Sequence, residues 1–110
     1  MRFRFWQYDD DYAGPEDRKE AEASEMVPGL WYVGSYHFCA YLLHTGEGPV
    51  LIDTCDKRAR EFFLAQIARA RAEPSSVAAV LHTHGHADHA GNTSEVVRLS
   101  GAMSLKSGGL

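Results

Sequence analysis

Residues 81–92 of this 110-residue chain read LHTHGHADHAGN, which brings four imidazoles and one carboxylate close together in the sequence. The apolar run at 77–81 predicts a buried strand before this stretch. After it, Asn92 and Glu95 predict a helix N-cap with its capping-box partner. The histidine-rich stretch is therefore expected on a loop between a strand and a helix, where α/β proteins place their ligand sites.

The spacing of these polar side chains suits metal ions. In a locally extended segment, residues two apart project to the same side, so His84 and His86 can bind one ion. Asp88 and His89 are sequence neighbours that diverge in direction, so we expect them to serve a second, adjacent ion. Imidazole and carboxylate ligands suit zinc first, and iron or manganese also accept them. The alternative is a histidine-rich loop that binds metal adventitiously, without catalytic consequence.

The pattern HxHxDH at 84–89, preceded by Thr83 and followed by Gly91, resembles the metal signature of the metallo-β-lactamase superfamily of hydrolases. The resemblance runs from about residue 30 to residue 105. It implies an α/β fold, the N-terminal half of an αββα sandwich. It also implies that a hydroxide activated by two zinc ions attacks an ester, thioester, amide or phosphoester, with Asp88 as both ligand and catalytic residue.

Asp53 ends a predicted apolar strand, where an unpaired carboxylate would be costly to bury. In the family that the chain resembles, the equivalent Asp supports the metal loop from behind the ligands, and Thr83 is expected to belong to the same supporting set. A helix N-cap is the other interpretation, and it is equally open to Thr54 and Asp56. Cys55 stands where the family usually has Gly, which indicates a backbone conformation that resists a side chain. A metal-ligand role for its thiol is the weaker alternative.

Periodicity and turn residues predict the remaining elements. A hairpin that turns at GEGP, residues 46–49, pairs Thr45 with Val50. This register puts Cys39 and Cys55 on opposite faces of the sheet, so we expect free thiols. The predicted strands are 30–36, 38–45, 50–54 and 77–83, and the predicted helices are 57–72 and 93–100.

Length and charge set the domain organisation. The chain is long enough for one domain that buries about two thirds of its unfolded surface. Residues 1–25 hold four Lys or Arg against eight Asp or Glu, which predicts a mobile acidic segment before a partial domain at 26–110. The net charge of −4 gives no basic surface for nucleic acid. No membrane-spanning or secretory segment is visible, so we expect a cytoplasmic protein.

The sequence also lacks part of the expected metal site. Members of the resembled family supply a further His to the first metal, a bridging Asp, and a final His to the second metal. No His follows His89 and no Asp follows Asp88 in this chain. We therefore expect a truncated chain that hydrolyses a small-molecule substrate poorly alone and that self-associates or needs a complementing chain. The alternative is a non-catalytic metal-binding fragment or interaction module.

Overall fold

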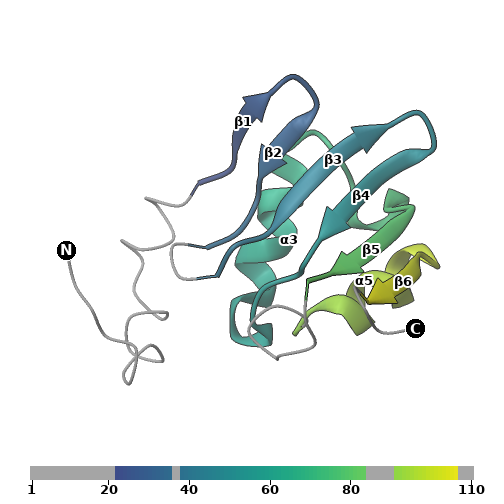
Figure 1. The fold of residues 1–110 in the computed structure, drawn as a ribbon. Helices are drawn as coiled ribbons and strands as arrows, with labels where there is room; N and C mark the ends of the chain where they lie inside the picture. The colour runs from purple at the N-terminus through teal and green to yellow at the C-terminus, as the bar shows by residue number, and fades with distance from the viewer. Residues whose placement is uncertain (1–21, 36–37, 84–90, 107–110) are drawn as a thin grey trace.

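The chain folds around a single twisted sheet, which Figure 1 shows from one side. The computed structural model describes residues 22–35, 38–83 and 91–106. Within these ranges the strands are β1 (Ser24–Val27), β2 (Leu30–Tyr32), β3 (Tyr41–Thr45), β4 (Gly48–Ile52), β5 (Ala79–His82) and β6 (Met103–Lys106). The helices are α3 (Arg60–Arg69) and α5 (Thr93–Ser100), with short 3-10 turns η2 (Lys57–Ala59) and η3 (Pro74–Ser76).

The strands lie across the sheet in the order in which they occur in the sequence. The first four pair antiparallel, as short turns allow, whereas β4, β5 and β6 pair parallel. A parallel step needs a crossover, and α3 and α5 lie in the two crossovers. The α/β class expected from the sequence is therefore confirmed.

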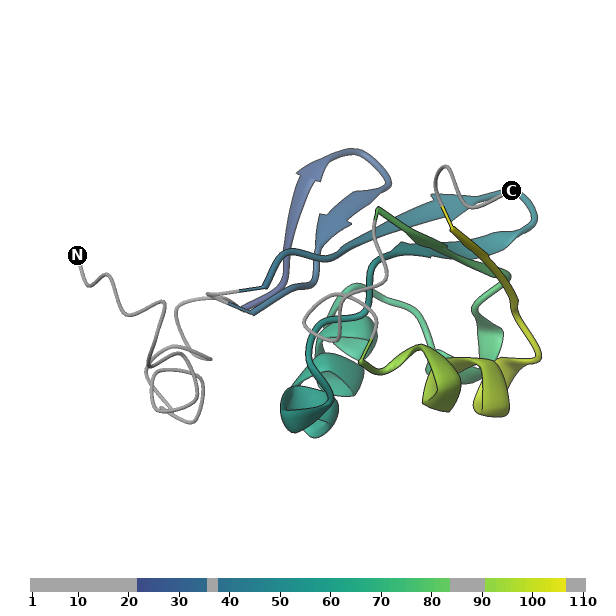
Figure 2. The ribbon, with the colours of Figure 1, turned by 60° about the horizontal axis from the view of Figure 1, so that its bottom comes forward.

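Both helices cover the same face of the sheet (Figure 2). Leu42, Leu51 and Val80 come from three adjacent strands and are fully buried on this face. Phe63 of α3 and Val96 of α5 belong to the same core and are also fully buried. Each such side chain stabilises the fold by about 1.5–3 kcal/mol. Among the described residues, neither helix has the length and apolar character that a membrane crossing requires.

No described helix covers the other face of the sheet (Figure 2), and this face carries apolar side chains. Leu43, Leu81, Met103 and Leu105 are all exposed. Leu81 pairs directly with Leu105, so these two side chains are neighbours. We call this surface the outer face. A contiguous exposed apolar surface of this kind is typical of a face that another protein layer covers.

The β3–β4 hairpin is tighter than the sequence predicts. Thr45 pairs with Gly48, so the expected pairing with Val50 is wrong by two residues. Gly48 has φ +118°, a conformation that side chains resist, and it lets the chain turn early. Because side chains alternate with a period of two, the shift leaves the faces unchanged. Cys39 is accordingly exposed and Cys55 buried, and both are free thiols as expected.

The hydrophobic pattern predicts neither β1 nor β6. All four residues of β1 are exposed, as are the side chains of Met103 to Leu105 in β6, so neither strand alternates between buried and exposed positions. Backbone pairing with β2 and β5 holds them in the sheet instead. β1 begins inside the segment expected to be mobile. Residues 1–21 lie outside the described residues, so their mobility stays a prediction.

Candidate metal centre

The structure describes the residues that flank the signature, but the signature itself lies outside the described residues. The four predicted metal ligands His84, His86, Asp88 and His89 fall within residues 84–90, outside the described ranges. Within those ranges, no group of three or more His, Cys, Asp or Glu side chains could hold a metal ion. Thr83 and Gly91, which flank the segment, are described, and the contacts of these two residues define the site's frame.

Asp53 holds the first end of the segment. Its side chain follows β4 and is only 4% exposed. Oδ1 accepts a hydrogen bond from the backbone N–H of Thr83 at 2.9 Å, and Oδ2 accepts one from Thr83 Oγ1 at 2.7 Å. The backbone N–H of Asp53 donates to the carbonyl oxygen of Leu81 at 2.8 Å. Because hydrogen bonds to a carboxylate are stronger than neutral ones, the residue before His84 is held firmly at two atoms.

Residues 53–56, which we call the support turn, also hold the second end. The carbonyl oxygen of Cys55 accepts a hydrogen bond from Gly91 N at 2.8 Å. Asp53 has φ +64° and Cys55 has φ +63°, both in the left-handed region. This conformation costs a residue other than glycine about 1–2 kcal/mol. The unusual backbone indicated by the replacement of Gly by Cys55 is therefore present, and it lets one turn contact both ends of the signature.

The side chain of Asn92 binds the support turn instead of capping its helix. Asn92 Nδ2 donates to the carbonyl oxygens of Thr54 at 2.7 Å and Asp56 at 3.1 Å, and its Oδ1 accepts from Arg60 Nε at 3.2 Å. No side-chain cap is formed at the start of α5, so the expected capping box with Glu95 is wrong. Asn92 is fully buried, so its amide group needs hydrogen-bond partners inside the protein. The support turn and Arg60 supply these partners. Glu95 instead pairs with Arg98 at 2.8 Å.

A second set of side chains joins the strand before the signature to the helix after it. His82, the last residue of β5, lies with its Nε2 2.6 Å from Thr93 Oγ1. Thr93 Oγ1 is also 2.9 Å from Thr54 Oγ1, and Thr54 Oγ1 accepts from the backbone N–H of Asn92 at 3.2 Å. His82 is thus a buried strand residue whose ring contacts the helix that follows the signature. The sequence contains no spacing signal that singles out Thr54 or Thr93.

Asp56 takes the N-terminal capping role that was also open to Asp53. Its Oδ1 accepts a hydrogen bond from the backbone N–H of Arg58 at 2.9 Å, and its carbonyl oxygen accepts one from Ala59 N at 3.0 Å. The Arg58 guanidinium pairs with both carboxylate oxygens at 2.9 Å. Because Asp56 begins the helical segment, the Asp53 carboxylate remains available to Thr83.

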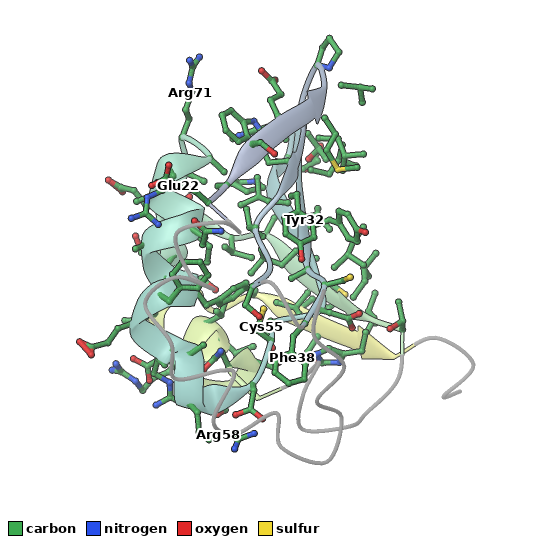
Figure 3. The ribbon with its side chains drawn as sticks, turned by 90° about the vertical axis from the view of Figure 1, so that its left-hand side faces the viewer. Glu22, Tyr32, Phe38, Cys55, Arg58 and Arg71 are labelled. Carbon is green, nitrogen blue, oxygen red and sulfur yellow. The ribbon has the colours of Figure 1, made fainter. Side chains whose placement is uncertain are left out.

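The thiol of Cys55 is unsuited to bind metal. Burial raises the pKa of this thiol to about 12, so it stays protonated at neutral pH, whereas metals bind the thiolate. Cys55 Sγ instead donates a weak hydrogen bond to the carbonyl oxygen of Phe38 at 3.4 Å, and the two residues lie near each other in Figure 3. The sulfur therefore belongs to the packing beneath the site.

A mixed sheet with a histidine-rich segment directly after β5, and a buried carboxylate that holds the residue before that segment, is typical of a metallohydrolase. The family model described as the Metallo-beta-lactamase superfamily matches residues 39–107. The chain therefore belongs to the metallo-β-lactamase superfamily.

Relatives and solved structures agree with this assignment. The human protein named metallo-beta-lactamase domain-containing protein 1 is 43% identical over 78 residues, which cover 71% of this chain and 28% of the relative. A hydroxyacylglutathione hydrolase of Anaeromyxobacter dehalogenans is 42% identical over 69 residues, or 63% of this chain and 25% of the relative. The crystal structure of a subclass B3 metallo-β-lactamase of Bradyrhizobium japonicum is 26% identical, with a TM-score of 0.72, and the match covers 76% of this chain and 31% of that one. The chain thus spans less than a third of the length of these proteins.

Proposed function

We propose that this chain carries the zinc-binding signature of a hydrolase that cleaves an ester, thioester, amide or phosphoester bond. His84 and His86 would hold one ion, and Asp88 and His89 a second. The donor set fits zinc, because neutral imidazole and carboxylate are ligands that zinc takes, and iron or manganese would also accept it.

The observation that carries this proposal is the pairing of Asp53 with Thr83. Both oxygens of the buried carboxylate accept hydrogen bonds from Thr83, the residue directly before His84. Left-handed backbone at Asp53 and Cys55 is costly, and such conformations persist at functional sites where the surrounding structure enforces them. Costly backbone and hydrogen bonds at both flanks of the signature support a site in which the position of the signature matters for binding a ligand.

The residues of the chain would divide the work. When bound, a divalent metal supplies a Lewis acid that polarises the scissile group and lowers the pKa of water to about 7. Asp88 would orient the attacking water through its carboxylate. Asp53 and Thr83 would keep the peptide before His84 in place, since partners behind metal ligands fix the orientation of those ligands. The names of the relatives, a hydrolase of hydroxyacylglutathione among them, favour an acyl substrate.

Metal content after extensive dialysis tests the proposal. The purified chain should retain zinc, and the double variant His84→Ala/His86→Ala should lose most of it. His44→Gln is the matched control, because His44 lies at the far end of β3, where its Nε2 contacts the carbonyl oxygen of Ala70 at 2.7 Å. Equal metal content in the wild type and the double variant would overturn the proposal.

We further propose that the remaining metal ligands come from polypeptide that packs on the outer face. The chain spans about 31% of the solved B3 structure, and its outer face exposes apolar side chains up to Leu81, three residues before His84, where the signature begins. A second sheet layer on this face would bury those side chains and approach the signature from the open side. The runner-up is a non-catalytic metal-binding module that uses the same face to join a partner.

The 110-residue chain should therefore be a poor hydrolase by itself. With zinc present, we expect little turnover of generic ester, thioester, β-lactam or phosphodiester substrates, and self-association through the outer face. Analytical ultracentrifugation and activity assays on the same sample check both points. Robust turnover by a monomer, lost in His84→Ala, would show that four ligands suffice.

A further inference from the structure

Two buried side chains and the half-buried Thr93 form a direct link between the strand that enters the signature and the helix that leaves it. His82 Nε2, Thr93 Oγ1 and Thr54 Oγ1 follow one another at 2.6 Å and 2.9 Å. His82 is the residue before Thr83, and Thr93 is two residues after Gly91. The link therefore connects the two flanks of the signature without passing through the backbone of the segment itself.

Burial makes this link sensitive to the loss of one group. Thr54 is fully buried and His82 is 5% exposed, so a polar group that loses its partner there cannot turn to bulk water. Thr54 Oγ1 also accepts the backbone N–H of Asn92 at 3.2 Å, which ties the link to the second end of the signature. A hydroxyl in the middle of such a chain is shared by both neighbours, so the removal of Thr93 Oγ1 would disturb His82 and Thr54 together.

We propose that Thr93, with Thr54 behind it, is a positioning residue that sets the separation of Thr83 and Gly91. Asp53 fixes Thr83 to the support turn, and the carbonyl oxygen of Cys55 fixes Gly91 to the same turn. The Thr93 hydroxyl adds the bond that holds the two flanks to each other. The separation of Thr83 and Gly91 would govern how well the signature binds metal. This consequence rests on the proposed function.

Metal affinity separates positioning from simple packing. Thr93→Val keeps the shape of the side chain but removes the hydroxyl, and the loss of a partner behind metal ligands typically weakens metal affinity about 10- to 100-fold. We therefore expect at least a tenfold weaker zinc affinity in competition with a chromophoric chelator, together with an altered Co²⁺ absorption spectrum. Thr93→Ser keeps the hydroxyl and should stay within about threefold of the wild type. Thr45→Val, a matched loss of a hydroxyl in the distant hairpin, should leave both readouts unchanged.

Amide exchange keeps the two proposals apart, because it needs no metal. In the metal-free chain, Thr93→Val should accelerate hydrogen exchange at Gly91 N, and at Thr83 N, by at least tenfold relative to Thr45→Val. If the wild-type chain binds no zinc while this acceleration is seen, the proposed function fails and the positioning role stands. Unchanged exchange in Thr93→Val overturns the positioning role, as does a Thr93→Ser variant that behaves like Thr93→Val. The serine variant also decides the matter if the valine variant does not fold.

Discussion

The two ends of the sheet are built by different kinds of hydrogen bond. At the signature end, side chains of the support turn bind residues 30 to 39 positions away in the sequence, and the support-turn residues Asp53 and Thr54 are buried. At the hairpin end, Thr45 Oγ1 donates to Gly48 O, three residues away, and accepts from Glu47 N, two residues away, both at exposed positions. Figure 3 separates the two ends, with Arg58 near the support turn and Arg71 at the opposite end of α3. The bonds of the hairpin are exposed, whereas each of these bonds of the support turn has a buried partner in Asp53 or Thr54, so we expect substitutions to be more costly at the signature end.

The largest effect is expected from Asp53→Ala. It leaves the N–H and Oγ1 of Thr83 without their carboxylate partner and places Ala in a left-handed conformation, so the free energy of unfolding should fall by about 3 kcal/mol. Urea unfolding measures this loss. Asp53→Asn, which tolerates the backbone and keeps a neutral acceptor, should lose less, and Glu47→Ala in the hairpin should change stability by less than about 0.5 kcal/mol. Equal losses at Asp53 and Glu47 would remove the distinction between the two ends.

Asn92→Ala should follow, with a loss of about 2 kcal/mol in the free energy of unfolding. Two buried carbonyl oxygens of the support turn and the Arg60 guanidinium lose their partner in this variant. Asn92→Ser supplies the matched control, because serine is an equally good helix N-cap but cannot reach the same partners. If Asn92→Ser restored full stability, helix capping rather than the support turn would explain the role of Asn92.

The pH dependence of stability should identify the buried thiol. Burial raises the pKa of Cys55 from 9.0 to about 12, so above pH 9 the unfolded chain releases a proton that the folded chain keeps. Stability is then fully present below pH 9 and falls as the pH rises towards 12, by about 1.4 kcal/mol per pH unit. Burial is also the largest cause of the raised pKa of Tyr32, so most of the Tyr32 contribution is shared by the wild type and Cys55→Ser. Urea unfolding from pH 8 to 10.5 should therefore show a shallower decline in Cys55→Ser, and parallel profiles would contradict the expectation.

The smallest effect is expected from Thr45→Val in the hairpin. Its hydroxyl bonds are exposed, so water replaces them and the free energy of unfolding should change by about 0.5 kcal/mol or less. Thermal unfolding of Thr45→Val and of Asn92→Ala under the same conditions compares the two losses of stability. A loss in Thr45→Val as large as that in Asn92→Ala would mean that exposure does not distinguish the two ends.

Hydrophobic periodicity was enough to predict most of the framework. The spacing of Phe63 and Ile67 predicts α3, the apolar run around Val80 predicts β5, and all three side chains are fully buried. The same method cannot predict β6, since Met103 and Leu105 lie on the outer face and the strand is held by backbone pairing with β5. An exposed strand leaves no burial pattern in the sequence.

The residues that frame the metal centre can be predicted only where the chemistry of a side chain limits the roles that it can take. A carboxylate at the end of an apolar strand needs donors, and Asp53 found them in Thr83. The predicted N-cap role of Asn92 is wrong because the same amide suits a helix N-cap and a buried turn, and only tertiary neighbours decide between the two. Thr54 and Thr93 carry hydroxyls that are common everywhere in proteins, so nothing in the sequence distinguishes them before the fold brings them together.

The order of the strands also determines how the molecule folds. A sheet whose neighbours in space are neighbours in sequence can grow strand by strand, and the antiparallel strands β1 to β4 need only short loops to close. The flanks of the signature adjoin β5 and α5, which follow α3 in the chain, so we expect them to meet late in folding. Zinc would then stabilise a sheet that already exists instead of nucleating it. Refolding rates should be nearly independent of zinc, whereas unfolding should slow in its presence.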